Sequence, residues 1–427
     1  MLRTTPIGSP RSGRHGLIRG VAIPAAAVAA LLLVAACGSS NNSSSGTATN
    51  KKPITLLFGT SGPAETAADK AAGAAFTKQS GIPVNVETSA NLQQQLAQDF
   101  AGGTPPNLFY LDPTSMQQYA AKGVLDPYAQ SLPNVNQFFP SLKSAFTYKG
   151  TLYCAPKDSS TLSLYVNNAD FTAAGLTSYP TTWAQLAADA KTLTTDGRVG
   201  LVTDPNESRL DSFLYQAGGS VLNAAGTKAV LNSAADVQAL TFVKSMLSAG
   251  TLKFPSQLNE SDEIPALGDN KTAMIITGPW MTGEMTSDFP KVSYSVHPLP
   301  AGPTGDKGTL VFTNCWGVPK QNDNLAGTIA FVKFLTSPAQ ELKFSKAFGV
   351  IPSLQTLSSQ FASQFPANAE PLQALAWAHP DINVPGSANA LTAFNSGLAE
   401  LATMSPQSIL NSANTNLQAV LTQNSAG

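Results

Sequence analysis

The sequence predicts an α/β protein whose sheets are covered by helices on both faces. From residue 54 to residue 312, short apolar segments with strand character alternate with segments of helical periodicity. The chain has 427 residues and is 43% hydrophobic, which is enough for two or more lobes with their own cores.

Strands are predicted where an apolar run stops at a turn residue or where apolar and polar residues alternate. In chain order these segments are residues 54–58, which precede Gly59, the alternating 82–86, and then 108–111, 152–155, 162–166, 273–277, 292–296 and 310–312.

Helices are predicted where apolar side chains recur at helical spacing between a capping residue and a glycine. Residues 64–79 end before Gly81, and Thr182 with Gln185 forms a capping box that starts a later helix. The predicted helices are residues 64–79, 92–100, 114–122, 182–191 and 237–247, and the C-terminal third is expected to be mostly helical.

Residues 1–36 are predicted to be a lipoprotein signal peptide. Four early arginines precede an uncharged apolar stretch over residues 21–36, which is shorter than the ~20 residues that usually cross a bilayer. The stretch ends in Val-Ala-Ala before Cys37, which matches the lipobox of bacterial lipoproteins. Cys37 is therefore expected to begin the mature chain and to carry lipid, and cleavage by an ordinary signal peptidase is the alternative.

Residues 37–52 are expected to be a lipid-anchored flexible tether. Gly38 to Asn50 contain no large apolar side chain that could offset the entropy cost of ordering. The protein is therefore expected on the extracytoplasmic face of the cell membrane, held there through the lipid on Cys37.

Charge argues against a nucleic-acid partner. The chain has 25 Lys and Arg against 26 Asp and Glu, and no run of three basic residues. Duplex binding needs clustered cations that displace counterions. Cys154 and Cys315 remain after the lipobox cysteine, and the export context permits a disulfide, but the sequence leaves open whether they pair.

Catalytic motifs are mostly missing from the sequence. Beyond the leader there are two histidines, His297 and His379, and neither lies beside a nucleophile motif. No cofactor and no metal site is expected. Asp262 and Glu263 are adjacent acids, which we interpret as part of a solvated loop. A glycoside hydrolase needs only two carboxylates, so that class stays as an alternative.

Several segments together resemble the solute-binding lipoproteins of ABC importers, in particular their maltose/trehalose-type sugar-binding group. In chain order these segments are Tyr-Lys-Gly-Thr-Leu-Tyr at 148–153, Leu-Tyr-Val-Asn-Asn-Ala-Asp-Phe at 164–171, Pro-Thr-Thr-Trp at 180–183, Lys-Thr-Ala-Met-Ile-Ile-Thr-Gly-Pro-Trp at 271–280, Trp-Gly-Val-Pro at 316–319 and Phe-Gly-Val-Ile-Pro-Ser at 348–353. Each segment is weak alone, and their order and spacing carry the resemblance.

The resemblance implies a two-lobed periplasmic-binding-protein-like fold of type II, with a ligand cleft between lobes and a hinge of crossing strands. It assigns residues 53–158 and 302–352 to an N-terminal lobe, and 159–301 and 353–427 to a C-terminal lobe. A ligand drives hinge closure only when it contacts both lobes, so the site residues must come from both.

A neutral sugar has apolar faces and a hydroxyl rim, and its site needs aromatic rings together with carboxylates or amides. By resemblance Trp280 and Trp316 are expected to be stacking platforms, Trp377 is a weaker candidate, and Trp183 is interpreted as structural.

The expected polar contacts to the sugar come from acids and amides near strand ends. By resemblance Asp112 and Asp158 lie where the family binds ligand, and Glu65 lies in the first strand-to-helix turn. Asn91 is a weaker candidate. Each has a structural alternative: a turn cap for Asp112, a salt bridge for Asp158, a helix-dipole interaction for Glu65 and an N-cap for Asn91. His379 stands where many relatives carry an arginine before a proline.

The leading hypothesis is a monomeric receptor that captures a neutral sugar or oligosaccharide and delivers it to the ABC permease subunits. Within the same family the alternative is a receptor for a glycerophosphodiester or a sugar phosphate. Arginine is favoured for binding phosphate, and only two arginines, Arg198 and Arg209, follow the leader, so this scarcity argues against the alternative. The alternatives from other classes are a secreted glycoside hydrolase and a purely structural lipoprotein.

Overall fold

The computed structural model describes residues 50–382 and 384–426. The described residues do not include the signal peptide expected over residues 1–36, the expected lipidation site Cys37 or nearly all of the predicted tether. Within the described part of the chain, no helix has the length and apolar character needed to cross a membrane.

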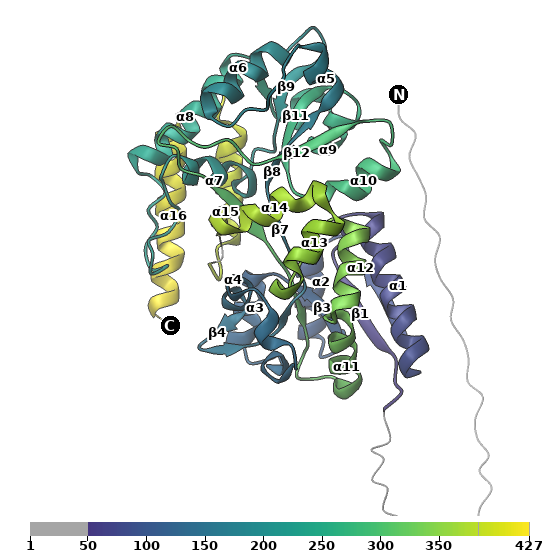
Figure 1. The fold of residues 1–427 in the computed structure, drawn as a ribbon. Helices are drawn as coiled ribbons and strands as arrows, with labels where there is room; N and C mark the ends of the chain where they lie inside the picture. Colours follow the sequence, from purple (N-terminus) through teal and green to yellow (C-terminus); the bar gives the residue numbers. More distant parts are fainter. Residues whose placement is uncertain (1–49, 383, 427) are drawn as a thin grey trace, which may run out of the picture. The chain divides into compact units, whose positions relative to one another are not determined.

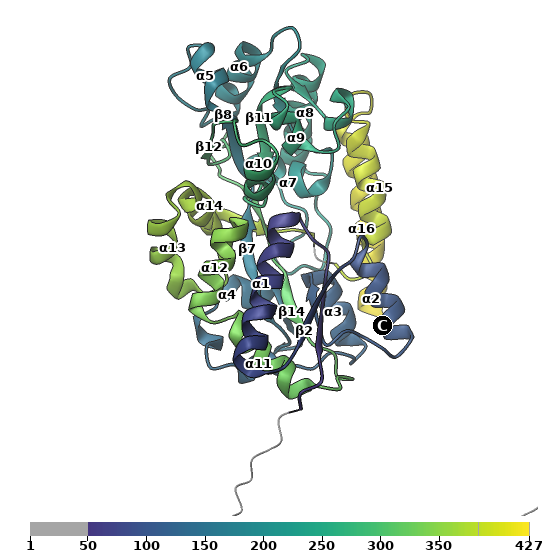
Figure 2. The ribbon, with the colours of Figure 1, turned by 90° about the vertical axis from the view of Figure 1, so that its right-hand side faces the viewer.

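The first sheet has five strands in the order β2-β1-β3-β14-β6. Its strands are β1 Ile54–Phe58, β2 Val84–Thr88, β3 Leu108–Leu111, β6 Ala155–Pro156 and β14 Cys315–Gly317. Strand β1 runs parallel to β2 and β3, whereas β14 is antiparallel to both of its neighbours. The accompanying helices are α1 Pro63–Ser80, α2 Leu92–Ala101, α3 Pro113–Ala121, α4 Pro140–Ala145, α11 Leu325–Leu335 and α12 Pro338–Phe348 (Figure 2).

The second sheet also has five strands, in the order β10-β9-β11-β8-β12. Its strands are β8 Ser163–Asn167, β9 Val199–Val202, β10 Leu252–Lys253, β11 Thr272–Thr277 and β12 Tyr294–His297. The helices around it are α5 Asn168–Ala173, α6 Trp183–Leu193, α7 Glu207–Gln216, α8 Ala234–Ser248, α9 Glu263–Gly268, α10 Met281–Ser287, α15 Ala388–Ala399 and α16 Pro406–Ala426 (Figure 1). Each five-stranded sheet has a hydrophobic core of its own.

A third sheet of four strands, β15-β7-β13-β16, connects these two parts. Its strands are β7 Asp158–Thr161, β13 Thr309–Phe312, β15 Ile351–Pro352 and β16 Ala378–Pro380, and helices α13 Ser358–Gln364 and α14 Ala369–Ala374 lie near it. Strand β7 lies between β6 and β8 along the chain, and β13 directly precedes β14. The chain therefore leaves the first sheet through β7, which lies between the two five-stranded sheets in Figure 1, and returns to it through β13.

Most predicted elements agree with the structure, and the clearest difference is the strand expected over residues 152–155. The structure divides it between β5 Thr151–Leu152, which forms a hairpin with β4 Thr147–Tyr148, and β6, which pairs with β14. The break falls at Cys154, which forms a disulfide with Cys315 across a Cα separation of 5.6 Å. The disulfide links the residue that precedes β6 to the first residue of β14, the strand that pairs with β6.

The two hydrophobic cores follow the sheets rather than the residue boundaries expected for the lobes. Leu310 packs in the core of the second sheet, and Leu354 and Leu357 pack in the core of the first. The expected boundaries at 302 and 352 had assigned Leu310 to the N-terminal lobe and Leu354 and Leu357 to the C-terminal lobe. The exact limits of the two lobes stay a prediction.

Candidate ligand-binding cleft

A cavity of about 480 Å³ lies where elements of all three sheets meet. The first sheet and its helices supply the turn before α1, the end of β6 and the end of α12, and the second supplies the starts of α7, α9 and α10. The lining residues used below are Ser61, Glu65, Lys157, Asp158, Asp204, Arg209, Asp262, Glu263, Trp280, Glu284, Phe312, Phe348 and Asp381.

The first wall of this cleft is a buried charge cluster around Lys157. The Nζ atom of Lys157 donates to Glu65 Oε1 at 3.2 Å and forms an ion pair with Asp158. Glu65 is held in the first turn of α1, where its Oε2 accepts the backbone N–H of Ser61 at 2.8 Å. Burial disfavours the charged ammonium, but the carboxylates of Asp158 and Glu65 outweigh it and raise the pKa of Lys157.

The second wall is built around Arg209 and Glu263. The Nε and Nη2 atoms of Arg209 donate to Glu263 Oε1 at 3.0 and 2.9 Å. Burial, and then the charge of Glu263, raise the pKa of the neighbouring Asp204. The Arg209 guanidinium also lies 5.2 Å from the centroid of the Trp280 ring, within the range of a cation–π contact.

The interpretation of Asp262 and Glu263 as a solvated loop is wrong. Asp262 is the N-cap of α9, and its Oδ1 accepts the backbone N–H of Ile264 at 2.8 Å. Glu263 is only 1% exposed because its ion pair with Arg209 offsets the cost of burial. Sequence reasoning missed Arg209 too, although it is one of only two arginines after residue 36, and that scarcity was the available signal.

Trp280 lies in the cleft, as expected. Its ring packs directly over Gly278, where an added Cβ would lie 2.0 Å from the ring, so only glycine permits this position. The ring meets Phe312 edge to face at a centroid distance of 5.5 Å. The Gly-Pro-Trp sequence at 278–280 therefore places an aromatic surface in the cavity beside Phe312 and Phe348.

Glu65, Asp158 and Trp280 are the predicted site residues that the structure brings together in the cleft. Trp316 is instead 3% exposed in β14, where it packs edge to face on Tyr110, so its expected position as a stacking platform is corrected to a core position. The regular β14 ladder turns this side chain into the core of the first sheet.

Four other predicted contacts do not line this cavity. Asp112 caps α3 by accepting the Ser115 N–H at 2.8 Å, as its structural alternative proposed. The Trp377 ring lies under the ammonium of Lys307, 4.4 Å from the centroid. The His379 ring stacks on Tyr215 at a centroid distance of 3.7 Å.

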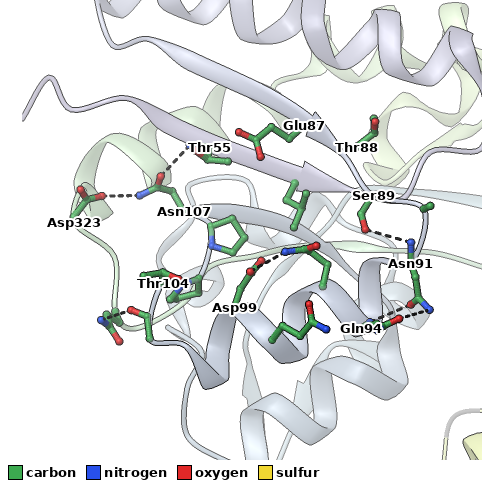
Figure 3. Close-up of a pocket in the computed structure, with 18 residues that line it drawn as sticks. Thr55, Glu87, Thr88, Ser89, Asn91, Gln94, Asp99, Thr104, Asn107 and Asp323 are labelled. Atoms are coloured by element: carbon green, nitrogen blue, oxygen red, sulfur yellow. Dashed lines mark hydrogen bonds between the residues drawn. The ribbon is translucent and has the colours of Figure 1, made fainter. Parts of the chain in front are cut away.

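Asn91 is the fourth, and it borders a different and larger cavity of about 970 Å³, shown in Figure 3. Asn91 caps α2 by accepting the Gln94 N–H at 3.1 Å. The lining comes from β1, β2, α2 and three nearby loops, and it contains no aromatic side chain. This cavity lies on the first sheet alone and offers no aromatic ring, so it does not fit a sugar that must contact both lobes.

Trp183 is structural, as the sequence indicated. Its Nε1 donates to Gln216 Oε1 at 2.7 Å, and its ring stacks on Phe242 at 4.5 Å between centroids. The side chain is buried in the core of the second sheet and does not reach the cleft.

Seven carboxylates and two cations line the cleft. Both cations are already paired, Lys157 with Glu65 and Asp158, and Arg209 with Glu263. Among the described residues, no three His, Cys, Asp or Glu side chains are grouped to hold a metal ion. The cleft therefore offers aromatic rings and hydrogen-bond acceptors, with no free cation in its lining to receive an anion.

Comparison with known proteins agrees with this fold. Residues 71–373 match the sequence profile of the bacterial extracellular solute-binding protein family. Binding proteins of Brucella abortus (strain 2308) and Brucella suis biovar 1 (strain 1330) are 26% identical over 283 residues, 64% of this chain and 69% of theirs.

Solved structures show the same architecture at low sequence identity. The ABC substrate-binding protein of Listeria monocytogenes in complex with cycloalternan superposes with a TM-score of 0.78 and 22% identity, over 87% of this chain and 99% of that one. The Thermus thermophilus maltotriose-binding protein with maltotriose gives 0.76 and 21%, over 86% and 99%. UgpB of Mycobacterium tuberculosis with glycerophosphocholine gives 0.77 and 17%, over 87% and 99%.

These matches confirm the α/β periplasmic-binding-protein fold expected from the resemblance. The family consists of solute-binding proteins rather than enzymes, and this argues against the glycoside hydrolase that the sequence analysis kept as an alternative. The fold has two five-stranded sheets, joined by β7 and β13, with a cleft between them, and the family profile matches most of the chain. The chain therefore belongs to the bacterial extracellular solute-binding protein family.

Proposed function

We propose that this protein is the substrate-binding component of an ABC importer and captures a sugar or oligosaccharide in the cleft of about 480 Å³. The observation that supports this proposal most directly is the combination of aromatic rings and carboxylates on facing walls of that cleft. Trp280, Phe312 and Phe348 offer surfaces for the C–H faces of a sugar, and the carboxylates accept its hydroxyls. Hydrogen bonds to charged groups contribute about 1.5–3 kcal/mol each.

The similar structures support a sugar as the ligand class. Among them are proteins in complex with cycloalternan, maltotriose and α-D-tagatose. The proposal includes lipid attachment at Cys37 and delivery to permease subunits in the membrane. It takes Glu65, Asp158 and Trp280 as ligand contacts, because their side chains line the cavity.

A glycerophosphodiester is the second candidate, because UgpB binds glycerophosphocholine in the same fold. Charge favours the sugar. A phosphate would add a negative charge to a lining that already has seven carboxylates, and both lining cations are held by those carboxylates.

The test is ligand-induced thermal stabilisation of the full-length protein, purified in a detergent without a sugar head group. A panel of sugars and glycerophosphodiesters is added at millimolar concentration. A ligand at 1,000 times its Kd stabilises the folded state by about 4 kcal/mol, which is a shift of several degrees.

Two tryptophan variants distinguish a cleft ligand from a general effect. The shift should disappear in Trp280→Ala and persist in Trp377→Ala, since Trp377 is partly buried and lies outside the cleft lining. A shift with a phosphodiester alone would establish the second candidate. No shift with any compound, or equal loss in both variants, would refute the proposal.

A further inference from the structure

The cleft carries more negative charge than its own cations neutralise. Four of its carboxylates belong to the second wall, and we call them the acidic wall: Asp204, Asp262, Glu263 and Glu284. Arg209 is the one cation lining that side of the cavity. Among the ion pairs of the described residues, none includes Asp204, Asp262 or Glu284.

A buried carboxylate oxygen without a partner is part of this wall. Glu263 lines the cavity and is 1% exposed, and only its Oε1 receives the Arg209 guanidinium. Its Oε2 accepts no hydrogen bond from an N–H or hydroxyl group of the described residues, and the Asp204 carboxyl lies beside the Glu263 carboxylate. A buried acceptor without a donor costs free energy, and a ligand donor would remove that cost.

The acidic wall is continued behind the cleft by two carboxylates on α7. Glu207 and Asp211 are 8% and 1% exposed, and Glu207 Oε2 and Asp211 Oδ1 also lack hydrogen-bond partners. They lie near the cleft residue Asp381: burial, and then the charge of Asp381, raise the pKa of Glu207 to about 7. A group with a pKa of about 7 is mostly protonated at pH 6.5, so the negative charge of the cleft comes from the acidic wall itself rather than from α7.

A neutral sugar would satisfy the acceptors of this wall but would leave its charge uncompensated. A protonated amine supplies N–H donors and a positive charge at once, and it is attracted by every carboxylate of the wall. A divalent metal ion is a poorer fit, because the described residues contain no compact group of three ligands for one ion.

We propose that the ligand is an amino sugar with a free, protonated amine, or an oligosaccharide that contains one, and that the amine binds at the acidic wall. The inference rests on the proposed function, since it takes a sugar as the ligand class. The sugar faces then lie against Trp280 and Phe312, and the amine lies beside Asp204, Glu263 and Glu284.

The test measures Kd by isothermal titration calorimetry on the full-length protein in a detergent without a sugar head group, at pH 6.5. Each sugar is offered in three forms that differ at one position: hydroxyl, free amine and N-acetyl amide. Examples are glucose, glucosamine and N-acetylglucosamine, and the corresponding β-1,4-linked disaccharides. The free amine should bind at least about tenfold more tightly than both neutral forms, and raising the salt concentration should weaken only the amine.

Glu284→Gln tests the acidic wall directly. Glu284 is a partly exposed residue on α10 outside every ion pair of the described residues, so the isosteric amide should leave the fold intact. It should weaken the amine about tenfold and change the neutral forms little. Glu400→Gln, an exposed glutamate outside the cleft lining, is the matched control and should change neither.

The outcomes separate this inference from the function on which it rests. If the hydroxyl or N-acetyl form binds as tightly as the amine in every set, the amine inference is wrong and the sugar receptor stands. If no form of any sugar binds, both are wrong. A thermal shift with calcium chloride alone that Glu284→Gln abolishes would mark a metal site and would also overturn the inference.

Discussion

Removal of the Cys154–Cys315 disulfide should destabilise the protein strongly, because this bond closes a long loop. The two cysteines are 161 residues apart, and all five strands of the second sheet lie between them. In the chain-entropy relation, a loop of that length lowers the entropy of the unfolded chain by about 17 cal/mol/K, which is about 5 kcal/mol at 25 °C. Strain and residual structure usually reduce this figure, so we expect about 3–5 kcal/mol.

The perturbation is the double variant Cys154→Ala/Cys315→Ala, since alanine suits two positions that are almost fully buried. In a cooperative unit of 150–250 residues each kcal/mol corresponds to about 2–4 °C in Tm, so the melting temperature should fall by roughly 10 °C. Differential scanning calorimetry measures it, and mass spectrometry under non-reducing conditions establishes that the wild type is oxidised.

A reducing agent supplies the internal control for this experiment. Dithiothreitol should lower the Tm of the wild type toward that of the variant and leave the variant unchanged. The reasoning fails if the oxidised wild type and the variant melt within about 2 °C of each other, because loop closure would then contribute almost nothing. It also fails if the purified wild type carries two free thiols.

Three further predictions concern pH, closure of the cleft and the membrane anchor. Burial raises the pKa of Glu341 to about 8, well above its usual 4.5, so the folded state holds this proton more tightly than the unfolded state. The contribution of this bound proton to stability is complete below about pH 4.5 and is lost as the pH rises to 8, so Tm should fall over that range. Tm should fall less in Glu341→Gln than in the control Glu87→Gln. Equal slopes of Tm against pH in the two variants would contradict this prediction. Gly283 on α10 meets Ala64 on α1, where an added Cβ would lie 2.7 Å from that of Ala64. Gly283→Val should therefore push these helices apart and weaken ligand affinity about tenfold by calorimetry. The control Thr286→Val, at an exposed position of the same helix, should not weaken it. Unchanged affinity in Gly283→Val would show that this contact plays no part in closure. Cys37→Ser should release the protein from the membrane fraction on immunoblotting, whereas Cys154→Ala/Cys315→Ala should leave it there; membrane retention of Cys37→Ser would rule out the lipid anchor.

Local sequence patterns were sufficient for most of the elements. The apolar run at 54–58 and the helix that ends before Gly81 lie within a residue or two of β1 and α1, because strand and helix periodicity and glycine caps act over a few residues. The capping interaction at Thr182 was also readable, since its Oγ1 accepts the Gln185 N–H at 3.3 Å. The reciprocal bond differs: Gln185 accepts from the Thr181 N–H, one residue earlier.

The candidate site was only partly predictable. Glu65, Asp158 and Trp280 belong to short motifs whose position in the fold the resemblance supplied, and they line the cleft. Asp112 and Asn91 have side chains suited either to a ligand or to a helix cap, and the structure shows them as caps. A local pattern is the same in both cases, so it did not distinguish them.

The sequence by itself determined the alternation of strands and helices, the family and the aromatic residue that follows Gly278 and Pro279. Only the tertiary structure decided that Arg209 from α7 pairs with Glu263 from α9, 54 residues away, and that Trp316 packs into a core. The physical reason is range. Backbone propensity and capping depend on neighbours along the chain, whereas burial, ion pairing and the negative charge of the cleft depend on segments that only the folded sheets bring together.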